Sequence, residues 1–389
     1  MEKVKTPLEE ALIRFRKDNL AKLGLLGIFF ILFFAVAAPL VANGRPLILY
    51  INGVLSFPFL HFLFAPDSTE ILVEQFFNYL LIYFILFPFI YLFCKRNKKI
   101  LILSSLIVGV LLLIPFITTK QVLEKRDWRT ETESLGKGEF AIFAPVPYGP
   151  AENVSQPYGY PSSAHYFGTD KIGRDVLSRM IYGARVSLAV GLFATGISIV
   201  IGIFVGLLSG YFGGRMDLLT MRIVEIVICF PTFLLLLILM SIMMDQNFKQ
   251  SIILVIAVIG FTGWTGLTRI IRGETLKLRK MAFIQACEAL GVPLHRIMLF
   301  HLLPNVIGPI MISFTFGIAG AILAESSLSF LGFGVQDPTS SWGELLRQSF
   351  EDPSTYWHLT LWPGLALFIA VLSFNFAGEG LRKTLDPKT

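Results

Sequence analysis

The chain has 389 residues, of which 54% are hydrophobic and only 15% are charged. A soluble protein of this length has charge on about a quarter of its residues, so we expect lipid to surround much of this chain. The net charge of +6 could suit nucleic acid, but the basic residues lie beside apolar runs and form no stripe with stacking aromatic residues, which argues against nucleic-acid binding. Three cysteines, Cys94, Cys229 and Cys287, show no paired spacing and are expected to be free thiols.

Eight stretches are long and apolar enough to cross a membrane as helices. A hydrocarbon core of about 30 Å needs roughly 20 helical residues, and a helix satisfies its own backbone hydrogen bonds in lipid. The first stretch has no small-residue cleavage pattern at its end, so we expect it to stay in the protein as a span. The predicted spans are residues 23–41, 72–94, 100–118, 186–211, 218–244, 251–267, 306–327 and 359–378.

Basic residues predict the orientation of these spans. They gather in four segments that eight spans place on one side of the membrane: 1–22, 95–99, 268–305 and 379–389. The positive-inside rule assigns that side to the cytoplasm. We therefore predict a multi-pass protein with both termini in the cytoplasm.

Two segments, 42–71 and 119–185, are then predicted to lie on the outer side. In the first, the pair Asn52-Gly53 between two β-rich runs indicates a β-hairpin over residues 47–57. The alternative is a further membrane span over 47–64, which would reverse the orientation of everything after it. The second segment holds five prolines between residues 145 and 161, which favours loop or extended chain over helix.

The cytoplasmic link 268–305 is predicted to contain two short helices outside the membrane. Helix formers fill residues 276–290, and Gly291 suits the residue that ends such a helix. A second helix is predicted over residues 294–300, after which Pro304 would help to start the next span. Periodicity alone would make this link an amphipathic connector on the lipid headgroups.

The same link resembles the Glu-Ala-Ala loop of ABC-importer permeases. In that loop Glu-Ala-Ala is followed by three residues, Gly, nine residues, Ile, one residue and Leu-Pro. The matching positions here are Gln285, Ala286, Cys287, Gly291, Leu303 and Pro304, with Gln285, Cys287 and His301 departing from the pattern. In the family the loop is a coupling helix that docks in a cleft of an ATPase subunit. The resemblance therefore implies that these six residues couple this chain to an ATPase.

Other stretches resemble dipeptide and oligopeptide permeases, and together the resemblance covers about residues 165–389 and the first span. A shorter segment, 45–58, is similar to the microcin C and peptide importer permeases. The two spans within 72–118 depart from the six-helix subunit of the family. The stretches that carry the main resemblance are residues 167–170, 173–175, 182–185, 325–334 and 380–387.

The resemblance implies an all-α polytopic membrane protein, with an ABC-importer permease core of six transmembrane helices and an inserted two-helix hairpin. It implies a transport subunit of the bacterial inner membrane that moves peptides or peptide-like solutes. Its implied partners are a second permease subunit, two ATPase subunits that bind ATP and Mg²⁺, an extracytoplasmic solute-binding protein and membrane lipid. The expected layout is an N-terminal segment 1–22, a first span 23–41, an outer hairpin segment 42–71, inserted helices 72–118, an outer loop 119–185, a transport core 186–378 with coupling loop 268–305, and a tail 379–389.

Three charged residues near the spans are candidates for a translocation path or gate. Arg222 and Glu225 are three residues apart and share a helix face, so a local ion pair is the alternative reading. Glu325 lies near the outer end of its span, where it could line the path or bind backbone donors.

Other function classes lack the residues that they need. No phosphate-binding loop is present, so ATP is expected to bind other chains and no cofactor is expected in this one. An intramembrane protease would need a nucleophile beside a base within the spans. Ser209 is the candidate nucleophile, but all five histidines fall in or next to loops, so no base is placed beside it. His295 and His301 are six residues apart and fall on different helix faces, so no metal site is expected. A channel or passive pore remains the alternative that needs no docking helix.

Overall fold

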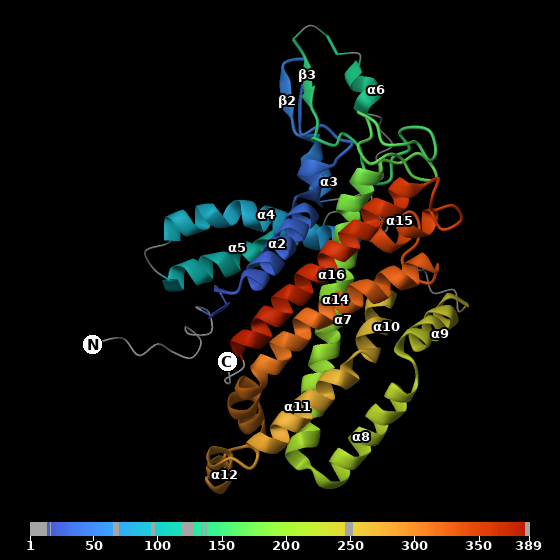
Figure 1. The fold of residues 1–389 in the computed structure, drawn as a ribbon. Coiled ribbons are helices and arrows are strands. Elements are labelled where there is room, and N and C mark those ends of the chain that lie inside the picture. Colours follow the sequence, from blue (N-terminus) through green and yellow to red (C-terminus); the bar gives the residue numbers. More distant parts are fainter. Residues whose placement is uncertain are drawn as a thin grey trace. The chain divides into compact units, whose positions relative to one another are not determined.

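The structure is a computed structural model, and it falls into two compact units. It describes residues 14–15, 17–64, 70–94, 98–118, 128–133, 135–136, 138–245 and 252–385. The core unit lies within residues 1–29, 187–335 and 365–389, and the second unit lies within residues 30–186 and 336–364. Three helices have residues in both units: α2 (Asn19–Val41), α7 (Val176–Phe212) and α16 (Trp357–Leu385) (Figure 1).

Six stretches of helix within the described residues are long and apolar enough to cross a membrane, and a bent pair makes a seventh when counted as one span. The expected helical, polytopic membrane fold is therefore confirmed. The predicted span 100–118 is helix α5 (Lys98–Thr118), but its apolar run Lys99–Ile114 is shorter than the six, so the count of eight stays a prediction. The six are Asn19–Val41, Ile71–Cys94, Val176–Phe212, Ile252–Leu278, Leu294–Phe330 and Trp357–Leu385.

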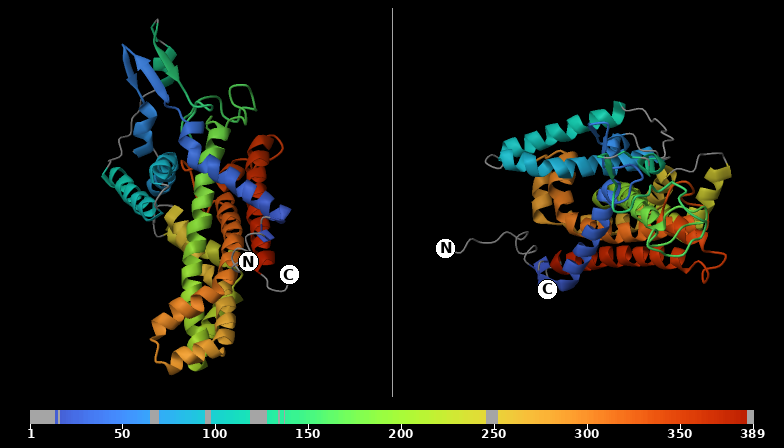
Figure 2. Two further views of the ribbon diagram at one scale, coloured as in Figure 1. Left: turned by 90° about the vertical axis from the view of Figure 1, so that its left-hand side faces the viewer. Right: turned by 90° about the horizontal axis from the view of Figure 1, so that it is seen from above.

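Close helix packing shapes the core unit. Its central helices are α7, α10 (Ile252–Thr262), α11 (Trp264–Leu278) and α14 (Ile307–Phe330) (Figures 1 and 2). Glycines recur along α7, and a Cβ at Gly206 would lie only 2.8 Å from Cβ of Ile271 on α11. One turn further, a Cβ at Gly210 would lie 2.6 Å from Cβ of Thr275. Small residues at this spacing let two membrane helices approach more closely than larger side chains allow.

Residues 218–244 do not form the single straight span that their composition predicts. Helix α8 (Gly214–Cys229) and helix α9 (Thr232–Asp245) meet at a bend of 82°. A proline disfavours helical backbone at the residue before it, and Phe230, which precedes Pro231, is extended with φ −86° and ψ 130°. The bend leaves α8 loosely packed, because Val224 is its one buried residue.

Three predicted spans belong to longer runs of helix. Helix α7 begins at Val176, ten residues before the predicted start at 186. The span predicted at 251–267 continues to Leu278, with one break at Gly263. The run before α14 starts at Leu294 and passes through α13 (Leu294–Arg296), a π-helix η1 (Ile297–Leu302) and a 3₁₀-helix η2 (Leu303–Val306). The sequence prediction marked the apolar part of each helix, and the helices continue into polar residues.

The hairpin predicted at residues 47–57 is present in the second unit. Strand β1 (Ile48–Ile51) pairs antiparallel with β2 (Val54–Ser56). The turn residues Asn52 and Gly53 have φ of 50° and 77°, as in the type I′ turn that matches the twist of paired strands. The prediction missed β3 (Phe140–Ile142), which pairs with the other edge of β1 (Figure 1).

Other elements of the second unit differ in part from the prediction. Helix α3 (Pro58–Phe64) follows the hairpin, so no continuous helix runs over 47–64. Within 119–185, residues 138–175 are mostly loop, as the prolines predict. The short helix α6 (Trp128–Glu133) was not predicted, and residues 119–127 lie outside the described ranges.

Buried ion pairs tie the loop before α7 to the segment that holds α15 (Trp342–Gln348). Arg174 Nη2 lies 2.7 Å from Oδ2 of Asp170 and 2.7 Å from Oδ1 of Asp337. Arg179, also buried, donates to Oε2 of Glu344 at 2.7 Å. Burial opposes ionisation of Asp337, but hydrogen bonding to Lys171 and the charge of Arg174 hold the pKa of Asp337 below its usual value. Buried charges stay ionised only when they are paired in this way.

The inserted helices α4 (Ile71–Cys94) and α5 lie side by side as a hairpin (Figures 1 and 2). A fully buried cation of α7, Arg185, holds α4 in place. Its Nη1 atom donates to Oε2 of Glu74 at 2.6 Å and to Oδ1 of Asn78 at 2.9 Å, and its Nε atom donates to the carbonyl of Ala35 at 2.7 Å. The inserted hairpin therefore supplies the carboxylate for a cation of the segment that resembles peptide permeases.

Replacing Glu74 with alanine should strongly destabilise the protein. The change leaves the Arg185 guanidinium buried without its carboxylate, and loss of one partner of a buried pair costs about 3–5 kcal/mol. Glu225→Ala is the matched control, because Arg222 and Glu225 form an exposed pair (side chains 67% and 59% exposed), worth about 0–1 kcal/mol. Thermal unfolding in detergent would measure both, and equal melting temperatures for the two variants would contradict the assigned role of Glu74.

Candidate functional site

The link between α11 and α14 holds the residues predicted to couple to an ATPase. The helix predicted over 276–290 is interrupted, because α11 ends at Leu278 and α12 (Ala282–Ala289) begins only after Met281, which is extended (φ −76°, ψ 142°). The turn Arg279–Met281 contains neither Gly nor Pro, so no residue type signals the break. Beyond it, α12 buries one residue, Ile284, which is 0% exposed.

Gly291 ends α12 as predicted. Its φ is +69°, the left-handed conformation that glycine adopts without strain. The Gly291 N–H donates to the carbonyl of Glu288 at 3.0 Å, and the Val292 N–H donates to that of Cys287 at 3.0 Å. These two bonds form a Schellman motif, which satisfies carbonyls at the helix end. Gly291 therefore sets the direction in which the chain leaves α12.

The six predicted coupling residues divide by exposure. Gln285 and Ala286 are exposed on α12, next to Leu290, which is 82% exposed at its tip. Cys287 and Leu303 are partly buried and pack against the apolar cluster that receives Ile284. The first group is free to meet a partner, whereas the second fixes the link to the core unit. The cluster consists of Leu207, Leu267, Ile271, Ile284, Ile297, Leu302, Val306 and Ile310.

Pro304, the last of the six, lies at the start of the 3₁₀-helix η2 and is exposed. A proline in an α-helix has no N–H to donate and clashes with the carbonyl four residues earlier. Here the preceding residues Ile297–Leu302 form a π-helix, whose wider turn accommodates the proline without ending the run. The helix predicted over 294–300 is thus the first part of a run that continues into α14.

A polar contact that the sequence reasoning missed joins α8 to α11. The carboxylate of Asp217, in the first turn of α8, accepts hydrogen bonds from Nε of Arg272 and, at 2.6 Å, from Nη2 of Arg272 on α11. Ser209 of α7 donates to the same carboxylate at 2.7 Å. At the start of α8, the N-cap residue Gly213 and the first helical residue Gly214 have φ of 64° and 54°. In the sequence, the Gly-Gly pair followed by an acidic residue was the available signal for a turn with a carboxylate beside it.

The predicted gate residues Arg222 and Glu225 form an exposed ion pair on α8, with 2.7 Å between Nη1 and Oε2. This geometry agrees with the local-pair reading. Glu325 is fully buried in α14 and accepts hydrogen bonds from hydroxyls of Ser187 at 3.1 Å and Ser329 at 2.8 Å. The Ser329 hydroxyl also accepts a bond from the Val335 N–H at 2.9 Å. Glu325 thus joins α7 to the end of α14 through serine hydroxyls.

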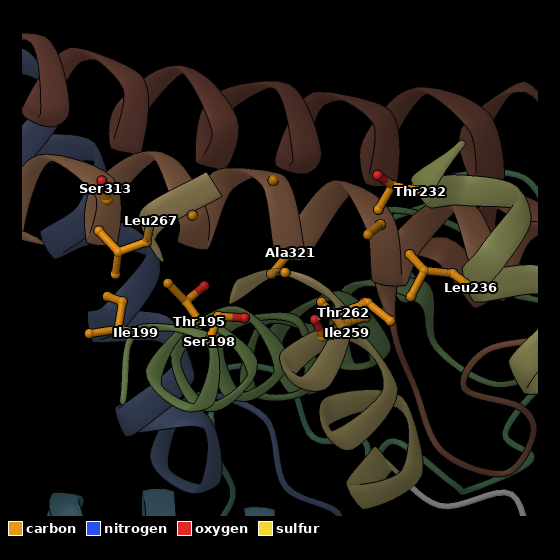
Figure 3. Close-up of a pocket in the computed structure, with 14 residues that line it drawn as sticks. Thr195, Ser198, Ile199, Thr232, Leu236, Ile259, Thr262, Leu267, Ser313 and Ala321 are labelled. Carbon is orange, nitrogen blue, oxygen red and sulfur yellow. Dashed lines mark hydrogen bonds between the residues drawn. The ribbon is translucent and has the colours of Figure 1, made fainter. Parts of the chain in front are cut away.

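A cavity of about 330 Å³ opens within the core unit (Figure 3). Residues of α7, α9, α10, α11 and α14 line it, and none of the described lining residues is charged. Gly317 and Gly320 of α14 are among the lining residues. Five lining residues carry hydroxyls: Thr195, Ser198, Thr232, Thr262 and Ser313. The sequence reasoning did not find this site, because its residues come from five helices.

Comparison with known proteins assigns this architecture. The family described as "binding-protein-dependent transport system inner membrane component" matches residues 198–389, and the "N-terminal TM domain of oligopeptide transport permease C" matches residues 6–51. The oligopeptide transport system permease protein of Haemophilus influenzae is 43% identical over 224 residues, which are 58% of this chain and 70% of that protein. The chain belongs to the peptide-permease family of ABC importers.

Two other relatives are similar to this permease at a comparable level of identity. The dipeptide transport system permease protein of Alkalihalophilus pseudofirmus is 38% identical over 251 residues, 64% of this chain and 81% of the relative. The glutathione transport system permease protein of Pectobacterium atrosepticum is 37% identical over 228 residues, 59% of this chain and 74% of the relative. The permease is thus a multi-pass inner-membrane transport subunit and not itself an enzyme.

The family matches leave out residues 52–197, which include α4 and α5. The matched part holds α12, Gly291 and every residue that lines the cavity from Ser198 onward. Within the described residues, no group of three His, Cys, Asp or Glu side chains could hold a metal ion. The family models therefore cover the link between α11 and α14 and most of the cavity lining, but not the inserted hairpin.

Gly291→Ala should loosen the end of α12 in this permease. An added Cβ would meet no atom within 4 Å, so the effect is the strain of a left-handed backbone, about 1 kcal/mol. Amide hydrogen exchange at positions 291 and 292 should then become about fivefold faster. Gly273→Ala is the control, because Gly273 lies inside α11 and an added Cβ also meets no atom there. Equal exchange in the variant and the unchanged protein would contradict the strain argument.

Proposed function

We propose that this permease moves peptides or peptide-like solutes into the cell. The observation that carries the proposal is its similarity to permeases named for oligopeptides, dipeptides and glutathione. The resemblance of residues 45–58 to microcin C importer permeases extends the proposed cargo to peptide-like antibiotics. Its proposed partners are a second permease subunit, an extracytoplasmic solute-binding protein and two ATPase subunits, which bind ATP and Mg²⁺.

Helix α12 is the proposed contact with an ATPase. It lies between two turns of the core unit, and all its residues except Ile284 and Cys287 are exposed. Ala286 is small, so a partner's cleft can approach the helix backbone closely at that point. Gln285 offers an amide, which can donate and accept hydrogen bonds. Leu290 adds an exposed apolar contact at the tip.

Transport then follows from a change in the populations of two states. ATP binding closes the ATPase subunits and moves α12, and the core helices attached to it move with it. A shift from 1:99 to 99:1 between two states needs about 5.5 kcal/mol of differential binding. The contacts of Ile284 and Cys287 with the apolar cluster support this transmission. In the proposed cycle the cargo gains access first from outside and then from the cytoplasm.

Ala286→Arg should weaken binding of the ATPase subunits without affecting membrane insertion. The added side chain is bulky and charged, and it occupies the face proposed to enter the partner's cleft. Gln285→Glu should be tolerated, because it restores the residue usual in the resembling loop. Co-purification of the ATPase subunits and peptide-stimulated ATP hydrolysis would measure both effects. Ala151→Arg, at an exposed loop position of the second unit, is the control. Full docking and stimulated hydrolysis in Ala286→Arg would rule out α12 as the coupling element.

The proposed orientation places the hairpin β1–β2 outside and α12 in the cytoplasm. A membrane-impermeant maleimide should label Val54→Cys in intact cells, because Val54 is 65% exposed at the hairpin. Ala289→Cys, exposed on α12, should react only after permeabilisation. A cysteine within 95–97, residues that lie outside the described ranges, should behave like Ala289→Cys if α4 and α5 both span. Labelling of Ala289→Cys in intact cells would overturn the orientation.

A further inference from the structure

The cavity of the core unit contains a buried hydroxyl without a partner. Thr195 on α7 is 5% exposed, and its Oγ1 atom has no hydrogen-bond partner among the described residues. The side chain lines the cavity, beside Ser198 (Figure 3). A buried polar group left unpaired destabilises the fold, and native proteins rarely keep one. The Thr195 hydroxyl is therefore placed to bond to something that enters the cavity.

Two neighbouring hydroxyls, those of Ser198 and Thr262, already bond to the protein. Ser198 Oγ donates to the carbonyl of Gly260 at 2.8 Å, and Thr262 Oγ1 donates to the carbonyl of Val258 at 2.8 Å. Their oxygen atoms can still accept a bond. The cavity thus offers Thr195 as a donor and acceptor, with further acceptors from Ser198 on the same helix and from Thr262 on α10. A ligand with both an N–H and a C=O group would match this arrangement.

The charge and size of the cavity limit further which ligands could bind there. No described lining residue is charged, so a carboxylate or an ammonium group would lose its hydration without gaining a counter-charge. The volume of about 330 Å³ is at the lower end of the range for small-molecule sites, about 300–1,000 Å³. The space suits a small part of an oligopeptide and not the whole. An uncharged peptide group, with N–H and C=O and a small side chain, meets each of these conditions.

Glycines fix the walls of the cavity. A Cβ at Gly317 would lie 2.6 Å from Cγ2 of Thr195, so α14 can approach α7 there only because residue 317 has no side chain. Gly320, one turn further along α14, would meet no atom within 4 Å if it carried a Cβ. At Gly317, contact between α14 and α7 closes the wall of the cavity. At Gly320, the wall borders open space. A larger residue at 320 would therefore occupy the cavity without displacing the protein.

We propose that this cavity is a binding subsite for an uncharged peptide group of the cargo, with the Thr195 hydroxyl as its hydrogen-bonding partner. The proposal rests on the proposed function in peptide import and adds a site within this single subunit. The site favours the internal peptide groups of a chain over its charged ends. It would hold a passing peptide by its backbone and so tolerate many side-chain sequences.

The test uses the complete transporter complex in nanodiscs of phosphatidylethanolamine and phosphatidylglycerol. Cys94, Cys229 and Cys287 are replaced with alanine, and Ala324→Cys places one thiol in the cavity lining. The probe is N-acetyl-trialanine amide, which has peptide groups and no charge. Binding of the probe should slow alkylation of the thiol by N-ethylmaleimide, and the concentration that halves the rate gives the affinity.

Thr195→Val should raise the probe concentration that halves the alkylation rate about 3- to 10-fold, the effect of losing one hydrogen bond. The same change removes a buried unpaired hydroxyl, so the melting temperature should not fall. Thr268→Val is the matched control, because its buried hydroxyl already donates to the carbonyl of Trp264 and lies outside the cavity lining. A lower melting temperature together with lost protection would instead indicate a structural role for Thr195 and overturn the proposal.

A second pair of variants tests occupancy of the space. Gly320→Leu should fill the cavity and abolish protection. Gly266→Leu adds the same side chain in α11, away from the lining, where an added Cβ meets no atom within 4 Å. Suppose that protection is unchanged in both Thr195→Val and Gly320→Leu, in a complex that still imports peptide. This result would overturn the proposed peptide subsite but not the proposed function in peptide import. A complex with no peptide import and no peptide-stimulated ATP hydrolysis would contradict the proposed function and this subsite with it.

Discussion

The burial of Ile284 is the contact on which the proposed role of the whole permease depends. It is the one fully buried side chain of α12, and it enters a cluster formed by α7, α11 and the run before α14. Burying such a side chain is worth about 1.5–3 kcal/mol, more than most exposed ion pairs. Because protein interiors are close-packed, a displacement of α12 is passed to its neighbours instead of being absorbed. An otherwise exposed helix is therefore mechanically part of the core unit.

Lipid imposes the second constraint, since every backbone polar group within it must be satisfied by the chain itself. The described helices meet this demand along most of their length, and two of their breaks lie beside the cavity and the proposed coupling link. Gly263 interrupts the run from α10 to α11 beside the cavity, and the π-helix Ile297–Leu302 lies beside the coupling link. The bend at Phe230–Pro231 divides α8 from α9. Irregular backbone in membrane proteins is tolerated where it is buried in protein or lines a cavity.

How far the sequence predicts this structure depends on the distance over which each signal acts. Local signals succeeded: Asn52-Gly53 marks the hairpin, and Gly291 marks the end of α12. Apolar runs marked the membrane helices but not their ends, and Pro231 inside such a run was not recognised as a bend. Contacts between distant residues could not be predicted, including Arg185 with Glu74 and Thr195 with Gly317, because nothing in a single sequence pairs them. The cavity was missed for that reason.

The two glycines at the start of α8 give that helix the geometry of a lever. Gly213 and Gly214 act as the pivot. Asp217, three residues beyond Gly214, accepts the hydrogen bonds of Arg272. At about 1.5 Å per residue, the short arm to Asp217 is about 4.5 Å long and the long arm to Cys229 is about 22 Å long. A rotation about the pivot that moved Asp217 by a given distance would thus carry the bend at Phe230–Pro231 about five times as far. Small displacements of α11, the helix that leads into α12, would be amplified at the opposite end of α8.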